Sequence, residues 1–264
     1  MQKLRSFLKN NLPKFILDKL VLLKTRKVII YKGVIRYNED ELITSHKCDF
    51  LYDPKFKAIY DLAVMDQLAI SPNIRWRAHV MCWAASNCMN LEGDFVECGV
   101  NRGFLSKIII DFVKFSDSSK KFYLLDTYEG FAEKYLSPNE LAKGMKSGGY
   151  EPCYEFVCKY FSKYANVQII KGIVPDTLEL VDANKIAFLS IDMNNVTPEI
   201  EAFLYFWEKI VDGGIVILDD YGHAGHEEQK NRFDSLAASF SFNILSLPTG
   251  QGLIIKQSRK NNYA

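Results

Sequence analysis

Short apolar runs alternate with longer amphipathic stretches along the chain from about residue 94 to its end. The apolar runs are rich in β-branched and aromatic residues and have the length of buried strands, whereas the stretches between them have helical spacing. The expected strands are residues 95–98, 122–125, 167–170, 187–191, 214–218, 242–247 and 253–256. The expected helices are residues 104–115, 153–164, 174–180, 198–211 and 227–240.

Strands that alternate with helices indicate βαβ units, so the pattern predicts an α/β fold with a doubly wound, Rossmann-like, mostly parallel sheet of seven strands. Residues 248–252 join the last two strands and contain a proline and two glycines. These two strands are therefore expected to form an antiparallel hairpin at one edge of the sheet. The polar, glycine-rich segment 136–149 is the predicted lid, because a connection of that length usually has a function.

The part of the chain before residue 91 follows a different pattern. Residues 56–91 have helical spacing with a break at 71–73, and short strands are expected within residues 27–37. We therefore expect a basic helical N-terminal arm or lobe over residues 1–90, and a cofactor-binding domain over residues 91–264.

Composition and cysteine content narrow the class of protein. With 48% hydrophobic and 25% charged residues, the chain is globular and not disordered. The net charge of +1 provides no basic field, so no nucleic-acid partner is expected. The six cysteines contain no C-x-x-C pair, and lysines interrupt the apolar positions of the N-terminus. Reduced thiols, the absence of a signal peptide and a cytoplasmic location are therefore expected.

The charge is unevenly distributed along the chain. Residues 1–27 contain eight Lys or Arg and one Asp, and their leucines recur at helical spacing. Such a basic amphipathic element either packs on its own domain or on a second copy of the chain, or makes peripheral contact with an anionic membrane. We expect the first arrangement, with a homo-oligomer, and keep membrane contact through residues 1–27 as the alternative.

The first predicted strand of the α/β domain ends in a glycine-containing turn that leads directly into a helix. Gly99 and Gly103 allow a ligand to approach the backbone closely. Glu97 occupies the position of the first glycine in a dinucleotide fingerprint. A carboxylate there repels a pyrophosphate but attracts a cationic ligand, so the motif favours S-adenosylmethionine over NAD.

Two further turns are candidate parts of the same pocket. Asp126 ends the second strand at the spacing where an acidic residue accepts hydrogen bonds from the ribose hydroxyls, which is the expected role, and a cap or turn residue is the alternative. After the third strand, Gly172 and Ile173 are placed to flank the adenine, or they form an ordinary turn into the next helix.

Acidic residues also end the next two predicted strands. Asp192 follows one strand, and Asp219 and Asp220 follow the other. If these strands are neighbours, their ends lie about 4.8 Å apart and the three carboxylates converge. Like charges so close need a counter-ion, and hard oxygen ligands suit Mg²⁺ or a similar divalent cation. The alternative is that some of these aspartates only cap loops or helices.

The same residues suggest how a hydroxyl could be activated. Coordination by a metal ion lowers the pKa of a hydroxyl steeply. Asp192 is the first candidate for the base that accepts the proton, and His223 in the following loop is a second candidate for a catalytic role.

Four stretches in order carry a resemblance to a known family. They are GDFVECGVNRG at residues 93–103, LLDTYEGF at 124–131, LSIDMNN at 189–195 and DGGIVILDDYGHAGHEEQK at 212–230. In these stretches the chain resembles the TylF-type (macrocin O-methyltransferase) family of class I S-adenosylmethionine-dependent methyltransferases. The resemblance implies methyl transfer to a hydroxyl, often on a sugar, and Mg²⁺ held by Asp192, Asp219 and Asp220. One departure is Asn194, where the family often has a second acid after the fourth strand.

The resemblance also implies a cofactor pocket at the ends of the first strands. Its expected residues are Glu97, Cys98, Gly99, Val100, Gly103, Asp126, Thr127, Gly172, Ile173 and Asp192. The expected function is a metal-assisted O-methyltransferase that acts on a sugar or another hydroxylated small molecule. The alternatives are a nucleotide-dependent oxidoreductase on the same fold and a membrane-peripheral, non-catalytic protein that retains a cofactor fold.

Overall fold

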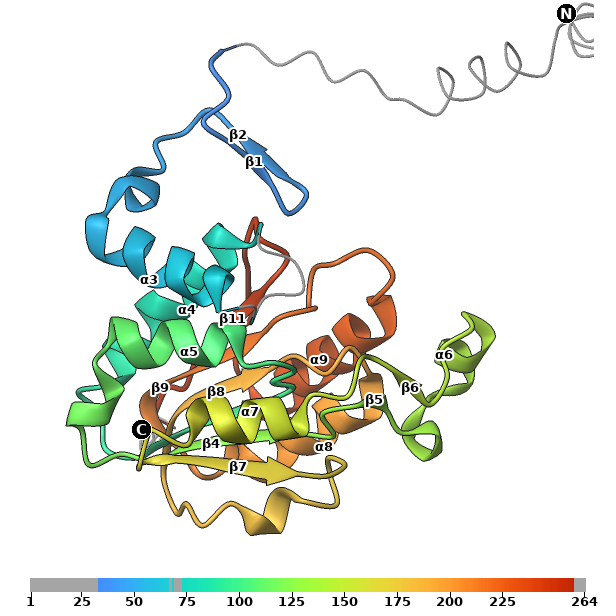
Figure 1. The fold of residues 1–264 in the computed structure, drawn as a ribbon. Coiled ribbons are helices and arrows are strands. Elements are labelled where there is room, and N and C mark those ends of the chain that lie inside the picture. Colours follow the sequence, from blue (N-terminus) through green and yellow to red (C-terminus); the bar gives the residue numbers. More distant parts are fainter. Residues whose placement is uncertain (1–32, 67, 69–72, 259–264) are drawn as a thin grey trace, which may run out of the picture.

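The computed structural model describes residues 33–66, 68 and 73–258. Its centre is a seven-stranded sheet with the strand order β10-β11-β9-β8-β3-β4-β7 (Figure 1). The strands are β3 (Asp94–Cys98), β4 (Phe122–Asp126), β7 (Val167–Lys171), β8 (Ile186–Ile191), β9 (Ile210–Leu218), β10 (Leu245–Ser246) and β11 (Gly252–Ile255). Strands β9, β8, β3, β4 and β7 pair in parallel, whereas β11 pairs antiparallel with both β9 and β10. The predicted sheet and its antiparallel edge hairpin are confirmed.

Helices cover both faces of this sheet (Figure 1). One face packs against α4 (Arg75–Cys88), α5 (Phe104–Phe112) and α7 (Tyr154–Phe161), with α3 (Pro54–Met65) packed on α5, and the other against α8 (Val196–Trp207) and α9 (Glu227–Phe240). Side chains alternate between the faces with a period of two, as strand geometry requires. In β3, Phe95 belongs to the first core and Val96 to the second, and in β9 the same holds for Ile215 and Val216.

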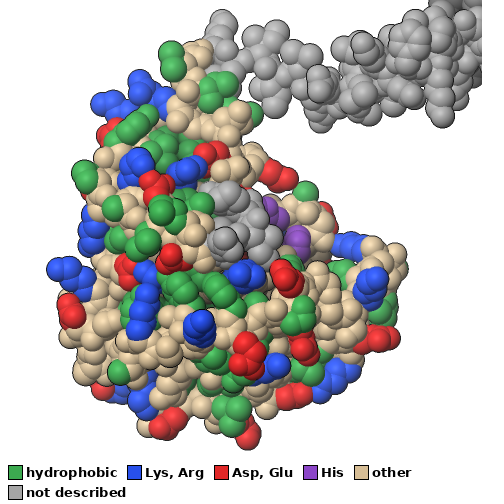
Figure 2. Space-filling model, in the orientation of Figure 1, with side chains coloured by type: hydrophobic (Ala, Val, Ile, Leu, Met, Phe, Trp, Pro, Cys, Tyr) green, Lys and Arg blue, Asp and Glu red, His purple; other side chains and the backbone are tan. Residues whose placement is uncertain are grey.

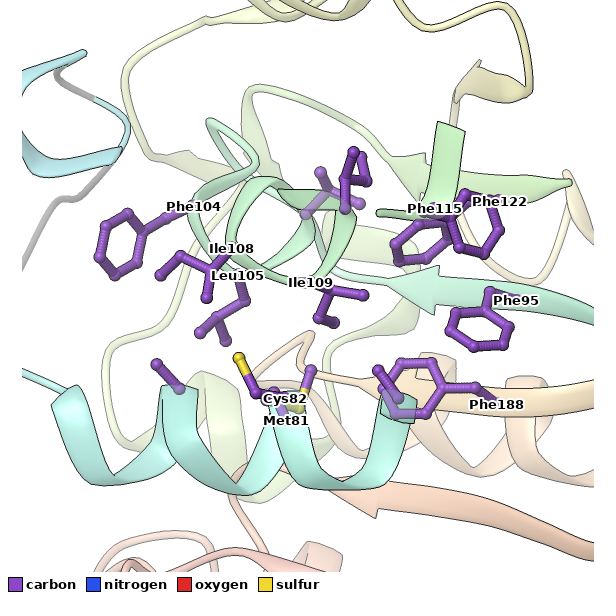
Figure 3. Packing of buried hydrophobic residues seen from close by; sticks show 14 of the residues in the cluster. Met81, Cys82, Phe95, Phe104, Leu105, Ile108, Ile109, Phe115, Phe122 and Phe188 are labelled. Carbon is purple, nitrogen blue, oxygen red and sulfur yellow. The ribbon is translucent and has the colours of Figure 1, made fainter. Parts of the chain in front are cut away.

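The core between α4, α5 and the sheet contains large side chains from all three (Figure 3). Met81 and Cys82 of α4 lie opposite Leu105 of α5, and Phe188 of β8 closes the cluster at the sheet. These four side chains are at most 8% exposed. Burial of a side chain of the size of Met, Leu or Phe contributes about 1.5–3 kcal/mol. Helix α4 is therefore held firmly on the sheet, and residues at its N-terminal end have fixed positions.

A short hairpin precedes these helices. It consists of β1 (Tyr37–Glu39) and β2 (Leu42–Thr44), and η1 (Asp49–Tyr52) follows it. Asp40 and Glu41 form its two-residue turn with φ of +52° and +61°, the left-handed pair of a type I′ turn. Asp53 then begins α3 as its N-cap, because its side chain accepts a hydrogen bond from the backbone N–H of Phe56 at 2.7 Å.

Several sequence predictions differ from the structure in extent. The predicted helix 174–180 is wrong: residues 174–177 form turns, and only η4 (Leu178–Leu180) is helical. Val174 and Leu178 are both buried in the second core, so packing of these two side chains overrides the helical spacing. The predicted strand 242–247 is reduced to β10. The predicted amphipathic arm of residues 1–27 lies outside the described residues, as does most of the segment 27–37.

The predicted lid segment has regular structure of its own. The predicted residues 136–149 contain α6 (Pro138–Ala142) and β6 (Gly148–Gly149). In the structure they belong to a longer segment, the lid (residues 130–150), which begins with β5 (Gly130–Phe131) and η3 (Glu133–Tyr135). The short helix η2 (Phe115–Asp117) lies earlier in the chain. Strands β5 and β6 pair antiparallel and hold the base of the segment, which projects to one side of the domain (Figure 1). On the face shown in Figure 2, Lys and Arg side chains are interspersed with Asp and Glu. Within the described ranges, no helix has the length and apolar character needed to cross a bilayer.

Candidate active site

A cavity of about 280 Å³ lies at the carboxyl ends of the parallel strands. Open α/β sheets bind their ligands at this edge. The predicted site residues that line the cavity are Glu97, Gly99, Val100, Asp126, Thr127, Gly172, Ile173, Asp192, Asp219 and Asp220. The structure therefore brings together the candidate cofactor residues and the candidate metal ligands in one space.

Three of the predicted site residues lie behind this lining. Cys98 is fully buried in the core beneath α8, because its side chain points to the opposite face from that of Glu97. Gly103 is the left-handed residue before α5, and a Cβ there would lie 2.5 Å from the ring of Phe161. His223 lies in the loop after β9, where its ring packs against Gly250.

The turn after β3 is packed directly against the end of β8. Gly99 has a φ of +92°, and a Cβ at this position would lie 1.7 Å from the carbonyl oxygen of Asp192. Only glycine fits this close crossing of two strand ends. The glycine thus brings the proposed cofactor turn and the proposed metal ligand into contact.

Asp126 organises the same turn. Its Oδ2 accepts hydrogen bonds from the backbone N–H groups of Val100 and Asn101, both at 2.7 Å. Its Oδ1 accepts from the backbone N–H of Tyr128 at 2.6 Å. The carboxylate therefore holds two loops at the mouth of the cavity. Oδ2 is fully used by its two hydrogen bonds, whereas Oδ1 accepts one from the backbone and keeps a second lone pair, so a hydrogen bond from a ribose hydroxyl to Oδ1 is compatible with this arrangement.

Glu97 is a buried acid at the floor of the cavity. Its side chain is 2% exposed, and Ser106 Oγ donates a hydrogen bond to its Oε2. Burial raises the pKa of Glu97 to about 8, and the charges of Asp219 and Asp126 raise it further, whereas the bond from Ser106 lowers it. Near neutral pH this side chain therefore holds a proton unless a cation is placed beside it.

The three aspartates at the ends of β8 and β9 converge as predicted. Asp192, Asp219 and Asp220 each offer one carboxylate oxygen, and these oxygens all lie within 4.8 Å of one another. Burial raises the pKa of Asp220 to about 7, and the charge of Asp219 contributes to this shift. Burial, together with the charges of Asp219 and Asp220, also raises the pKa of Asp192 well above its usual range. The cluster is therefore short of positive charge.

One carboxylate oxygen in this cluster is an unused acceptor. Asp220 Oδ2 is buried and has no hydrogen-bond partner among the residues that the structure describes, and the nearest cationic candidate, His226 Nδ1, is 3.9 Å away. An unsatisfied buried acceptor is costly unless a ligand occupies it. An all-oxygen donor set with such an acceptor fits a hard divalent cation.

Asp219 differs from Asp220 because both of its oxygens already have partners. Arg77 of α4 donates from Nη1 to Oδ2, and Gln251 donates from Nε2 to Oδ1 at 2.9 Å. Arg77 also donates from Nε and Nη2 to the two oxygens of Asp40, at 2.7 and 2.9 Å. Burial lowers the pKa of Arg77, but the charges of Asp219 and Asp40 outweigh it and raise the pKa above its ordinary value.

The loop that carries Asp192 is held from two sides. Glu199 of α8 accepts a hydrogen bond from the backbone N–H of Met193 at 3.1 Å. Asn194 has a φ of +55° and donates from Nδ2 to Asp192 Oδ1 at 3.1 Å. Glu140, in the lid helix α6, accepts from the backbone N–H of Val196 at 2.8 Å. The lid and α8 thus both fix the position of Asp192.

The lid also places aromatic rings over the cavity. Phe131 and Tyr150 both line it, with their ring centroids 5.6 Å apart. Burial raises the pKa of Tyr150, and the charges of Asp192 and Asp220 raise it further. Ser137 Oγ donates to Glu228 of α9 at 2.9 Å, so the lid is closed onto the body of the domain.

Sequence reasoning did not identify several of these groups. They are Arg77, Glu140, Tyr150, Glu199 and Gln251. None of them directly follows a parallel strand of the seven-stranded sheet, where sequence reasoning looked for site residues, and the pair of Arg77 and Asp219 is 142 residues apart in the chain. Arg77 shares the first turns of its helix with Arg75 and His79, so the sequence does not single it out or indicate its partner.

Comparisons with known proteins give a consistent result. The profile of the family described as Macrocin-O-methyltransferase (TylF) matches residues 74–236. None of the curated proteins compared with the chain matches it.

Several solved structures have a similar fold. The O-methyltransferase NovP has a TM-score of 0.62 at 17% identity, covering 78% of this chain and 98% of its own. The calicheamicin methyltransferase CalS11, also described as TDP-rhamnose 3′-O-methyltransferase, has a TM-score of 0.53 at 15% identity, covering 80% and 98%. SAH-bound PaMTH1 from Podospora anserina has a TM-score of 0.50 at 13% identity, covering 78% and 88%. At these identities the likeness shows a shared fold.

Proposed function

The chain belongs to the TylF macrocin O-methyltransferase family, and we propose that it transfers a methyl group from S-adenosylmethionine to a hydroxyl of a sugar or another hydroxylated small molecule, with help from a divalent cation. Family membership shows a methyltransferase, which sets aside the oxidoreductase alternative, and it implies S-adenosylmethionine as the methyl donor. The observation that carries the rest is the convergence of three aspartates beside the cofactor turn, with one buried oxygen unsatisfied.

The residues of the first three strand ends suit the methyl donor. S-Adenosylmethionine, when bound, supplies an electrophilic methyl group on a positively charged sulfur. Glu97 lies at the floor of the cavity, where a cation next to it stabilises its ionised form. Gly99 leaves room for a close approach to the backbone, and Asp126 faces the cavity from β4, where we propose that it accepts hydrogen bonds from the ribose. Gly172 and Ile173 are the proposed adenine contacts.

The acid cluster suits the divalent cation. Asp192, Asp219 and Asp220 would hold it through one oxygen each, and Asp220 Oδ2 is the acceptor that lacks a partner among the described residues. When bound, such a cation lowers the pKa of a coordinated hydroxyl and orients it.

We propose Asp192 as the group that accepts the acceptor's proton. Its Oδ1 is engaged by Asn194, so the proton goes to Oδ2. A divalent cation beside Asp192 would hold its carboxylate in the ionised form, which can accept a proton. His223 is a weaker candidate, because its ring packs on Gly250 and is not part of the cavity lining.

The acceptor is proposed to enter beneath the lid. Phe131 and Tyr150 line the same cavity as the acid cluster, so their rings offer an apolar surface to the acceptor. The sugar class is suggested by the family and by CalS11, whose described substrate is TDP-rhamnose.

A methyl-transfer assay tests the proposal. The full chain is incubated with S-adenosylmethionine that carries a labelled methyl group and a panel of nucleotide sugars, free sugars and polyols. The assay is run with Mg²⁺, with a chelator, and with Mg²⁺ restored in excess. Label on a hydroxylated acceptor that disappears with the chelator and returns with Mg²⁺ is expected. If the chelator leaves methyl transfer unchanged, the role of the cation is refuted. If none of the compounds in the panel becomes labelled, the proposed substrate class is refuted.

A further inference from the structure

One guanidinium connects the N-terminal hairpin to the acid cluster. Arg77 bridges Asp40, in the turn of the hairpin, and Asp219, at the end of β9. Its side chain is 17% exposed, and those of Asp40 and Asp219 are 14% and 3% exposed. All three are therefore shielded from solvent, where charge interactions are strong.

We propose that Arg77 is a built-in counter-cation that competes with the divalent cation for Asp219, and that Asp40 regulates this competition by holding the guanidinium on the hairpin side. The inference rests on the proposed cation site and adds a control over its occupancy. It assigns a positioning role to Arg77 and Asp40, and neither residue is assigned direct contact with the reacting atoms.

The competition follows from the state of the two neighbouring aspartates. Asp219 has both oxygens engaged, one by Arg77 and one by Gln251, whereas Asp220 Oδ2 has no partner among the described residues. A guanidinium does not deprotonate in proteins, so Arg77 cannot lose its charge when a divalent cation arrives. The cation must therefore share Asp219 with a fixed positive charge, or the guanidinium must withdraw from it.

Asp40 provides the place to which the guanidinium can withdraw. Arg77 makes two hydrogen bonds with Asp40, from Nε and Nη2, and only one with Asp219. Paired hydrogen bonds between a guanidinium and a carboxylate are the stronger arrangement. When the single hydrogen bond to Asp219 breaks, the guanidinium therefore stays on Asp40 with its charge still paired.

The hairpin is built to hold Asp40 in this position. Glu39 accepts a hydrogen bond from Arg75 at 2.5 Å, and Tyr37 Oη accepts one from the backbone N–H of Trp76 at 3.2 Å. These contacts and the Asp40 pair fix three hairpin residues on three consecutive residues of α4. Glu41 at φ +61° shows that the turn adopts a conformation that non-glycine residues rarely take.

The proposal predicts opposite effects for the two partners. In Arg77→Gln the competing charge is lost, so a divalent cation binds about tenfold more tightly or better. In Asp40→Asn the guanidinium loses its second carboxylate and remains on Asp219, so the cation binds about tenfold more weakly. In the double variant the affinity follows Arg77→Gln, because Asp40 acts through Arg77.

The test is a titration of the full chain with Mn²⁺ in the absence of S-adenosylmethionine. Binding is measured by calorimetry and by the electron paramagnetic resonance signal of free Mn²⁺. Arg75→Gln is the matched control, because it removes the neighbouring ion pair between the same helix and hairpin and leaves Asp219 unchanged; its affinity is expected to equal that of the wild type. Arg77→Lys retains the charge, and its affinity is expected to stay well below that of Arg77→Gln. Thermal unfolding checks that each variant is folded, and if Arg77→Gln does not fold, the Asp40→Asn titration decides, because weaker Mn²⁺ binding than in the wild type is expected and equal or tighter binding overturns the proposal.

Tighter Mn²⁺ binding by Arg77→Gln supports the proposal, including the case in which the wild type shows no binding. Equal or weaker binding by Arg77→Gln overturns it, as does the same increase in Arg75→Gln. If neither the wild type nor Arg77→Gln binds Mn²⁺, both this inference and the cation in the proposed function are refuted. If the Mn²⁺ affinities follow the expected order but no methyl transfer is found, only the proposed reaction is refuted.

Discussion

Glu97 is a residue whose ionisation is coupled to folding. In an unfolded chain its carboxyl ionises near the ordinary glutamate pKa of 4.5, whereas burial raises the pKa in the folded protein to about 8. Between these two values the folded protein holds a proton that the unfolded chain has released. Stability therefore falls as the pH rises through this window, and the loss is complete above the folded pKa.

Glu97→Gln is expected to remove this loss, because an amide does not ionise. In the cofactor-free protein the free energy of unfolding of the wild type should fall by about 2–4 kcal/mol more than that of the variant between about pH 5 and about pH 9. Urea unfolding at a series of pH values measures the difference. Parallel pH profiles for the two proteins would show that Glu97 is ionised in the folded state throughout.

Gly99 offers a second test at the scale of one residue. Gly99→Ala would place a Cβ 1.7 Å from the backbone of Asp192, so the ends of β3 and β8 must separate. The expected loss of stability is more than about 3 kcal/mol, with weaker binding of S-adenosylmethionine.

Gly144→Ala is the matched control for this substitution. Gly144 has a similar φ of +87°, but a Cβ there meets nothing within 4 Å. Its expected cost is only the left-handed conformation itself, about 1 kcal/mol. Thermal unfolding and calorimetry compare the two variants. If both lose the same small amount, the close crossing at Gly99 is not what constrains that position.

At the scale of elements, the lid helix α6 is linked to helix α8. Glu140 is 5% exposed, and its two oxygens accept from the backbone N–H groups of Ser137 and Val196. Ser137 is the N-cap of α6 and forms a capping box with Glu140. One carboxylate thus closes the start of its own helix and satisfies a backbone donor at the start of α8.

Glu140→Ala is expected to release the lid. Two buried backbone N–H groups lose their acceptor, so the protein should lose about 1–3 kcal/mol and residues 132–150 should be cleaved faster by protease. Limited proteolysis and urea unfolding measure these effects. Glu133→Ala is the control, since Glu133 is an exposed acid in the same segment. Equal cleavage of both variants would contradict a docking role for Glu140.

The elements that the sequence predicted best are those governed by local periodicity. The helix predicted at 227–240 has those bounds in the structure, and the strand ends at Asp192 and Asp219 could be placed together because parallel neighbours end at one edge. The helix predicted at residues 174–180 was wrong because the burial of Val174 and Leu178 in the core favours turns over the helix that their spacing predicts. Arg77 could not be placed, because its position depends on how α4 packs on the sheet.

At the scale of the whole molecule, three segments far apart in sequence meet at the carboxyl edge of one sheet. The hairpin β1–β2 reaches it through Arg77, the lid covers it with Phe131 and Tyr150, and the strand ends supply the acids. Helices α4 and α8 pack on opposite faces of the sheet and hold these segments in fixed positions relative to it. The layered fold therefore determines where the site lies, and the acidic strand ends together with Arg77 determine its charge.

Calorimetric titration of the full chain with S-adenosylmethionine, and in parallel with NADH, tests the central claim most directly. The account predicts that S-adenosylmethionine binds at a single site and NADH does not, and that Asp126→Asn weakens S-adenosylmethionine binding by about tenfold or more. Binding of NADH without binding of S-adenosylmethionine, or an affinity that Asp126→Asn leaves unchanged, would contradict a sulfonium site at this edge of the sheet.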